Sequence, residues 1–167
     1  MITIAAAPEN SKVSASLADA YFHDTYEAMI EGTEKSIMEI YLRAVANTPS
    51  WIQMLMRLRN RIVSMVGLKD LGGMGDIDPH KPADSYRVGD RVAIFSILSL
   101  TENELVLGDS DKHLRAQVSL YKYQGSPGKV AVTTVVHVHN FLGRAYLFFV
   151  VPVHKRIVPA MLRRMVV

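Results

Sequence analysis

The spacing of apolar and polar positions divides the first half of the chain into one strand and two helices. Residues 20–30 alternate loosely and are rich in Tyr, Phe and Thr, which is typical of a strand. Residues 34–47 and 48–67 repeat apolar side chains every three or four positions, which predicts two amphipathic helices. The second has Thr48 as an N-cap and Pro49 at its first helical position.

The second half of the chain predicts a sheet followed by a helix. Apolar alternation marks four further strands, at residues 92–100, 104–109, 113–123 and 130–140. Short turn-like connections between them favour an antiparallel meander. From residue 142 the spacing becomes helical again, although two prolines predict a kinked or late-starting helix. The pattern predicts an α+β fold.

The last two strands have a register that can be predicted. The apolar faces of the two strands lie on the same side of the sheet only in every second pairing register. Of these registers, the short turn between the strands favours the one that places His113 opposite His139 and Arg115 opposite His137. One face of this pair is then apolar. The other carries three histidines and an arginine.

Three interpretations of that polar face stay open. His113, His137 and His139 could together bind a divalent metal. His113, Asp111 and Arg115 could serve as an acid, a base and an anion clamp, respectively. The third interpretation is a solvated or structural sheet face, with the aspartates of "DSDK" shaping the turn through Asx hydrogen bonds.

Asp24 is a further catalytic candidate. It alternates with Phe22 and Tyr26 on the first strand, so it belongs to a mostly apolar face. A charged group is costly there unless it is paired. The alternative interpretation is a surface or ion-paired carboxylate on an edge strand.

Composition excludes several classes of protein. The chain has no cysteine, so disulfides and cysteine-based zinc sites are excluded. The longest apolar run, residues 145–153, is shorter than the roughly 20 residues of a membrane-spanning helix, and residues 1–19 lack a secretory signal. We therefore expect a cytoplasmic protein with no transmembrane segment, a loose leader over residues 1–19 and a single domain over residues 20–167.

The net charge of +3 is mild, and it does not indicate a nucleic-acid-binding protein. Lysine and arginine nevertheless gather in two segments, near residues 57–61 and 155–164. Solvated helix faces explain this, and so does a surface for anionic membranes or an acidic partner. A homodimer is left open.

The predicted order of elements resembles the helix-grip fold of START-type and birch-pollen-allergen-like proteins. Four stretches, over residues 49–69, 106–120, 133–146 and 152–164, are similar to a bacterial family of unknown function thought to share that fold: "PSWIQMLMRLRNRIVSMVGLK", "VLGDSDKHLRAQVSL", "TTVVHVHNFLGRAY" and "PVHKRIVPAMLRR". The resemblance implies a curved antiparallel sheet wrapped around a long C-terminal helix, with an apolar cavity between them. It supplies no catalytic residues.

Binding of a small hydrophobic or lipid-like ligand in that cavity is the function we expect, with no cofactor. The alternatives are a cyclase- or hydrolase-like enzyme in the same cavity, although no catalytic motif is recognisable, and side chains that simply fill a core. The expected ligand-lining residues come from the sheet and the last helix: Phe95, Ile97, Ala116, Val118, Leu120, Val136, Val138, Phe148, Val151 and Met161.

Overall fold

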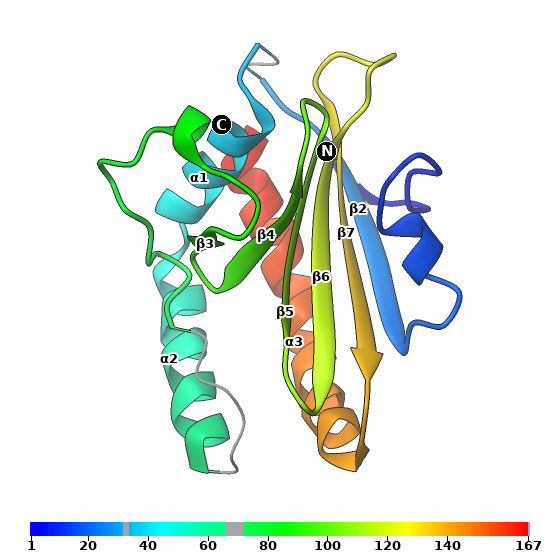
Figure 1. Cartoon of the computed structure of the whole chain (residues 1–167), viewed down its shortest axis with the longest axis vertical. Helices are drawn as coiled ribbons and strands as arrows, with labels where there is room; N and C mark the ends of the chain where they lie inside the picture. Colours follow the sequence, from blue (N-terminus) through cyan, green and yellow to red (C-terminus); the bar gives the residue numbers. More distant parts are fainter. Residues whose placement is uncertain (32–33, 66–71, 167) are drawn as a thin grey trace.

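The computed structural model describes residues 1–31, 34–65 and 72–166, and it shows one antiparallel sheet flanked by helices (Figure 1). The sheet has seven strands in the order β1-β2-β7-β6-β5-β4-β3. The strands are β1 (Ile2–Ile4), β2 (Phe22–Met29), β3 (Arg91–Val92), β4 (Phe95–Leu100), β5 (Glu104–Ser110), β6 (Leu114–Lys122) and β7 (Lys129–Val138).

Three α-helices accompany the sheet: α1 (Ile37–Ala46), α2 (Ser50–Met65) and α3 (Phe141–Val166). Two short 3₁₀ helices, η1 (Ser14–Ser16) and η2 (Ala83–Ser85), lie in the connecting segments. Helices α1 and α3 cover one face of the sheet, which we call the inner face (Figure 1). The predicted α+β fold, with two helices after the first long strand and a long C-terminal helix against the sheet, is confirmed.

Helix α1 begins later than the sequence predicted. Its N-cap is Ser36, whose side chain accepts a hydrogen bond from the Glu39 backbone N–H, while the Glu39 carboxylate accepts one from the Ser36 N–H. This reciprocal pair satisfies two backbone donors that a helix start leaves open. Glu34 and Lys35, which the sequence pattern placed in this helix, are therefore not helical. Thr33, the residue before the predicted helix, lies outside the described residues.

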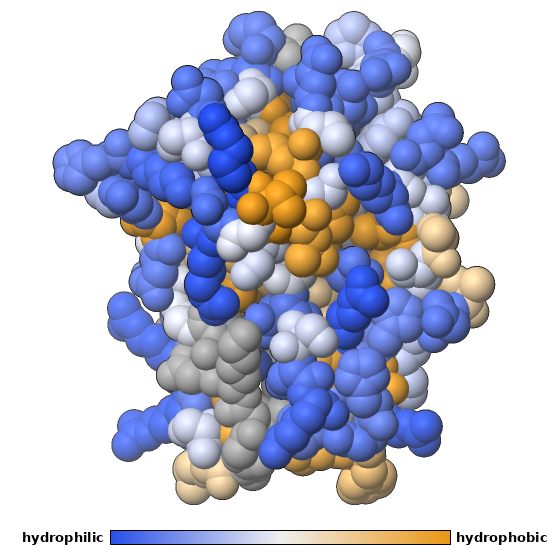
Figure 2. Space-filling model, viewed as in Figure 1, coloured by the Kyte–Doolittle hydropathy of each residue, from blue (hydrophilic) through white to orange (hydrophobic). Residues whose placement is uncertain are grey.

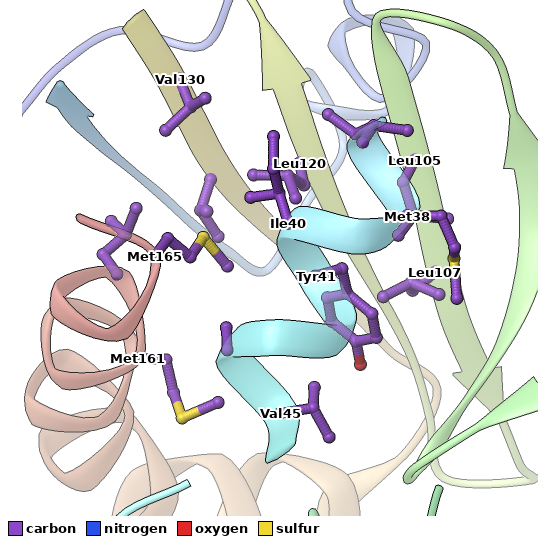
Figure 3. Close-up of a cluster of buried hydrophobic side chains, with 14 of the residues drawn as sticks. Met38, Ile40, Tyr41, Val45, Leu105, Leu107, Leu120, Val130, Met161 and Met165 are labelled. Carbon is purple, nitrogen blue, oxygen red and sulfur yellow. The ribbon is translucent and has the colours of Figure 1, made fainter. Parts of the chain in front are cut away.

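Apolar side chains from α1, the central strands and the end of α3 form the main core (Figure 3). Ile40 and Tyr41 on α1 lie between Leu120 of the sheet and Met161 of α3. Helix α1 therefore occupies part of the space that the helix-grip resemblance leaves for a cavity. Three of the expected ligand-lining residues are buried in this core, Ile97, Leu120 and Met161, and two more, Phe95 and Val118, are half-buried against it.

The predicted register of β6 and β7 is confirmed. Arg115 pairs with His137, and the His139 N–H donates to the His113 carbonyl at 2.8 Å. Gly143, early in α3, packs against the same carbonyl. A Cβ atom there would lie 2.5 Å from it, which is why the start of α3 needs a glycine.

The expectation of a loose leader over residues 1–19 is wrong. Strand β1 pairs with β2, and Val13 is 1% exposed against Val106 and Val135 on the outer face of the sheet. Glu104, also buried on that face, holds the segment through its carboxylate. The segment is ordered because it covers apolar side chains of the sheet and because Ser11 and Lys12 donate hydrogen bonds to the buried Glu104 carboxylate.

The outer face of the β6–β7 pair is therefore covered in part by protein. The Nε2 atom of His137 lies 3.1 Å from the Ser16 carbonyl and 3.2 Å from the Asp19 carboxylate. This part of the face is therefore structural, as the interpretation of a solvated or structural face allowed.

Two element boundaries also differ from expectation. The strand expected over residues 92–100 is split into β3 and β4 by Ala93, which has a φ of 54°. Helix α3 starts at Phe141 and continues through both prolines. On α2, Ile52 and Val63 are buried, whereas Ile62 is exposed.

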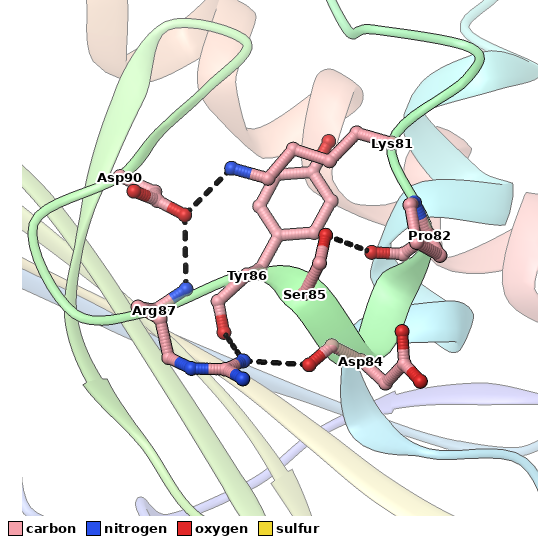
Figure 4. A network of polar contacts seen from close by, with 7 residues as sticks. All are labelled: Lys81, Pro82, Asp84, Ser85, Tyr86, Arg87 and Asp90. Carbon is pink, nitrogen blue, oxygen red and sulfur yellow. Dashed lines mark hydrogen bonds and ion pairs between the residues drawn. The ribbon is translucent and has the colours of Figure 1, made fainter.

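The connection into β3 is fixed by a polar network (Figure 4). The Lys81 Nζ atom lies 2.7 Å from the Asp90 carboxylate and 4.3 Å from the centre of the Tyr86 ring. The same carboxylate accepts from the Arg87 backbone N–H. These interactions lower the pKa of Asp90, the hydrogen bond from Lys81 contributing most.

Candidate functional site

A polar pair lies on the inner face of the sheet. Asp24 projects from β2 toward α3, and its Oδ1 atom lies 3.1 Å from Nε2 of His154. The side chains are 11% and 19% exposed, respectively. This pair joins two elements that are distant in sequence, and it is set among apolar side chains of the sheet and the helix.

Pairing of three strands defines the surroundings of Asp24. It lies opposite Thr134 on β7, and Thr134 lies opposite Val118 on β6, so the three side chains form a row across the inner face. The Oδ2 atom of Asp24 and the Oγ1 atom of Thr134 are both buried without a hydrogen-bond partner in the described part of the chain. Buried polar groups are ordinarily paired, so two such atoms on neighbouring strands mark this row as unusual.

The environment of the pair is apolar and negatively charged. The ring of Phe22 meets the imidazole of His154 edge-on, with ring centres 5.6 Å apart. Two residues along β2, burial raises the pKa of the Tyr26 hydroxyl, and the negative charge of Asp24 raises it further. The site therefore combines one carboxylate, one imidazole and the hydroxyls of Thr134 and Tyr26 with aromatic and aliphatic neighbours.

The inner face is fully covered at one end and only partly covered at the other. Along β6, Leu120 is 2% exposed, whereas Val118, Ala116 and Leu114 are half-buried. Val118 belongs to the row that contains Asp24. The row that carries Asp24 therefore lies at the border between the two parts, because Thr134 is 4% exposed and Val118 is half-buried against the main core.

The remaining expected ligand-lining residues differ in how deeply they are buried and in which side of α3 they occupy. Phe95, Ala116, Val118, Val138 and Val151 are half-buried, and Val136 is buried on β7. Phe148 is 76% exposed on the side of α3 away from the sheet, so its expected place in a cavity wall is wrong. Helical spacing could not distinguish the two sides of a helix that is apolar nearly all round.

The catalytic cluster considered for the β5–β6 hairpin does not form. The Asp111 carboxylate accepts from the backbone N–H groups of His113 and Leu114, at 2.7 and 3.0 Å, so it shapes the turn as the Asx interpretation predicted. His113 instead contacts the side chain of Asn140, and Arg115 is exposed on the outer face.

The three-histidine metal site is also wrong. His113 turns toward Asn140, His137 toward Ser16 and Asp19, and His139 is exposed. Among the residues that the structure describes, no three His, Asp or Glu side chains are placed to hold a metal ion together.

The sequence analysis missed two site residues, Thr134 on β7 and His154 on α3. His154 lies on the apolar stripe of α3, four residues before Val158 and seven after Leu147. A lone histidine on such a stripe needs a polar partner from another element. That signal was available in the sequence, and Asp24, a lone carboxylate on an apolar strand face, was its counterpart.

A second polar cluster lies on the outer face. The Glu27 carboxylate accepts from the Tyr123 hydroxyl at 2.5 Å and lies 3.0 Å from the Lys129 Nζ atom. Burial opposes ionisation of Glu27, but these hydrogen bonds outweigh it and lower the pKa of the carboxyl. A shallow hollow of about 220 Å³ lies beside this cluster, at the β6–β7 turn.

Comparison with known proteins identifies a family but no activity. A family model described as "Protein of unknown function (DUF2867)" matches residues 16–161, which include every strand from β2 to β7 and most of α3. No curated protein and no solved structure matches the chain. The match includes both Asp24 and His154. The chain therefore belongs to the DUF2867 family of proteins of unknown function.

Proposed function

We propose that the chain binds a small, mostly apolar molecule between the inner face of the sheet and α3, with Asp24 as its polar anchor. The observation that carries this proposal is the pair of buried acceptor atoms, Asp24 Oδ2 and Thr134 Oγ1, that have no partner within the described residues. Ligand sites are mostly apolar and contain a few polar groups that fix orientation.

The chemistry of the anchor limits the class of ligand. A carboxylate oxygen accepts hydrogen bonds and repels other anions. Thr134 can accept one hydrogen bond and donate another. We therefore expect a ligand with an aliphatic or aromatic body and a hydroxyl or amine that donates to Asp24. A fatty-acid carboxylate would place two negative charges side by side.

Apolar residues around the row supply the rest of the site. Val118 and Ala116 on β6 and Val151 on α3 are half-buried, so a ligand could bury the remaining surface. Covering such surface contributes about 25 cal/mol per Å². Three of the residues expected from the sequence to line a cavity thus support this proposal, together with Val136 beside Thr134.

The first experiment is native mass spectrometry of the purified protein, compared with its denatured mass. An added mass of a few hundred daltons that extracts into organic solvent supports an occupied site. The second experiment measures thermal unfolding with 1-dodecanol, dodecanoate and dodecane as probes. The proposal expects 1-dodecanol to stabilise the chain most, because it alone combines an apolar tail with a neutral hydrogen-bond donor.

Matched threonine variants locate the site. Thr134→Val removes the unpartnered hydroxyl, and we expect it to abolish most of the stabilisation by 1-dodecanol. Thr133→Val is the control, because Thr133 is the next residue of β7 and its hydroxyl pairs with Thr25 on the outer face at 3.0 Å. Equal loss in both variants, or no preference for 1-dodecanol over dodecane, would contradict the proposal.

The contact between His154 and Asp24 supports a second candidate, acid–base catalysis in the same place. An imidazole whose nitrogen faces a carboxylate is the arrangement used to orient a general base. Hydrolysis of 4-nitrophenyl butyrate tests it. Turnover should disappear in His154→Gln and persist in His139→Gln, whose imidazole is exposed elsewhere. Equal turnover in both variants would remove His154 from the reaction.

A further inference from the structure

Helices α2 and α3 expose a group of large apolar side chains at one end of the molecule. The C-terminal end of α2 and the N-terminal end of α3 lie at the same end of the domain (Figure 1). Six apolar residues there are between 53% and 83% exposed: Leu58, Ile62, Met65, Phe141, Phe148 and Phe149. We call this the helix-tip surface. Figure 2 shows apolar side chains at the lower tips of both helices on an otherwise largely hydrophilic lower half.

The two helices contact each other at the centre of this surface. The Nε atom of Arg59 on α2 lies 3.0 Å from the Tyr146 hydroxyl on α3, and its guanidinium lies over the Tyr146 ring. Ile62 is one turn from Arg59, and Phe149 is one turn from Tyr146, so exposed apolar residues flank the contact. The surface is therefore shared by both helices.

The charged side chains of α2 and α3 are all positive. Helix α2 contains three arginines and α3 contains five lysines and arginines, whereas neither contains an aspartate or glutamate. The other residues of the chain hold all 16 of its Asp and Glu but only 11 of its 19 Lys and Arg. Arg57, Arg61 and Arg144 lie among the exposed apolar residues of the helix-tip surface.

We infer that the helix-tip surface docks the protein onto an anionic lipid bilayer. Apolar side chains beside arginines are the composition of helices that lie in a membrane interface. A second copy of the chain fits less well, because two copies joined at this surface would bring their arginines together. The acidic remainder of the chain would be repelled by the same bilayer, which fixes the orientation of the protein.

Helix α3 is long and apolar enough, by length and composition alone, to cross a membrane from Phe141 to Met165. Only 22% of its most apolar 18-residue segment is buried, whereas most of an ordinary core helix is buried. Its contact with β2 through His154 and the burial of Leu147 and Leu162 hold it to the sheet. A helix held in this way places its exposed side on the bilayer rather than within it.

Flotation with vesicles tests the inference. The full chain should bind vesicles of 70% phosphatidylcholine and 30% phosphatidylserine, and bind pure phosphatidylcholine vesicles much more weakly. Binding should weaken as salt rises, because Arg57, Arg61 and Arg144 contribute by electrostatic attraction. Absence of binding to the anionic vesicles, or equal binding to both vesicles at every salt concentration, would overturn it.

Two pairs of variants at exposed positions distinguish a loss of membrane docking from a general loss of folding. Phe148→Ser with Phe149→Ser should reduce binding at least tenfold, while Leu98→Ser, an exposed apolar residue on β4, should not. Arg61→Gln should reduce binding about fivefold, and Arg115→Gln on the outer face should leave it unchanged. Equal effects of test and control variants would overturn the inference.

Sedimentation in the absence of vesicles tests the alternative that a second copy of the chain covers the helix-tip surface. The docking inference expects a monomer whose sedimentation is the same in wild type and in the Phe148→Ser, Phe149→Ser variant. A dimer that this variant dissociates would assign the helix-tip surface to self-association and overturn membrane docking.

Discussion

The Nε2 atom of His154 lies 3.1 Å from the Oδ1 atom of Asp24, which joins α3 to β2 on the inner face of the sheet. The second carboxylate oxygen of Asp24 has no partner within the described residues. A pair that only stabilised the fold would be expected to use both oxygens. The single contact leaves half of the carboxylate available, which is the basis of the proposed ligand anchor.

Replacement of one partner should cost more stability than replacement of both. His154→Leu leaves the largely buried Asp24 carboxylate unpaired, and we expect it to lower the free energy of unfolding by about 2–3 kcal/mol. The double variant Asp24→Val, His154→Leu should unfold near the wild-type denaturant midpoint, because it replaces the pair with apolar side chains. Urea unfolding measures both changes.

His139→Leu serves as the control for this pair, because its imidazole is exposed and should contribute less than about 0.5 kcal/mol. A double variant as unstable as His154→Leu alone would show that the pair is needed for the fold. The functional interpretation of Asp24 would then lose its main support.

The N-terminal segment should depend on one buried carboxylate. The Glu104 Oε1 atom accepts from the hydroxyls of Ser11 and Ser119, each at 2.6 Å, and both carboxylate oxygens accept from the Lys12 N–H. Glu104→Gln replaces one acceptor with a donor, and we expect it to cost about 1–3 kcal/mol.

Limited proteolysis gives a second readout of Glu104. Cleavage within residues 1–20 should accelerate in Glu104→Gln and remain at the wild-type rate in Glu102→Gln, whose side chain is exposed. Equal cleavage rates in both variants would indicate that the segment is held by its apolar contacts alone.

Local pattern predicted most of the sheet, because alternation and turn length act over short distances. The register that places Arg115 opposite His137 followed from matching two apolar faces. The same local signals are weak in the three-residue β1, which the sequence did not predict, and in the two-residue β3, which it joined to β4 as one strand. The covered outer face depends on Val13 and Glu104, which are distant in the sequence, and so it could not be predicted from either segment.

The sequence analysis named only one member of the Asp24–His154 pair. Asp24 stood out as a carboxylate on an apolar strand face, whereas His154, a lone histidine on the apolar stripe of α3, stands beside the basic residues Lys155 and Arg156 and was not singled out. The histidine cluster failed for a physical reason. Strand pairing fixes which side a residue faces, but the covering segment decides where the imidazole of His137 finds a partner.

Tyr41 carries a buried hydroxyl that has no hydrogen-bond partner among the described residues (Figure 3). Burial accordingly raises the pKa of this tyrosine well above its ordinary value. Tyr41→Phe removes an unsatisfied polar atom while keeping the ring, so we expect it to raise the free energy of unfolding by about 1 kcal/mol. The matched variant Tyr123→Phe removes a hydroxyl that donates to Glu27 and should lower it by a similar amount. Urea midpoints that move in the same direction would contradict this account.

Glu27 should make stability depend on pH in the acidic range. Its folded-state pKa is lowered from an ordinary 4.5, because the hydrogen bonds from Tyr123 and Lys129 outweigh the opposing effect of burial. A lowered folded-state pKa means that the unfolded chain takes up its proton first as pH falls. The stabilisation by Glu27 is therefore complete above its ordinary pKa and is lost as pH falls through the folded-state value.

Glu27→Gln should lower the free energy of unfolding by about 1–2 kcal/mol near pH 7, because it removes a charged partner from Lys129 and Tyr123. The difference between variant and wild type should shrink steadily below about pH 4. Urea unfolding at several pH values measures it, with Glu31→Gln as an exposed control. A difference that stayed constant down to about pH 2 would mean that the ionised carboxylate is not the stabilising group. The hydrogen bond from Tyr123 would then act equally well on a neutral acceptor.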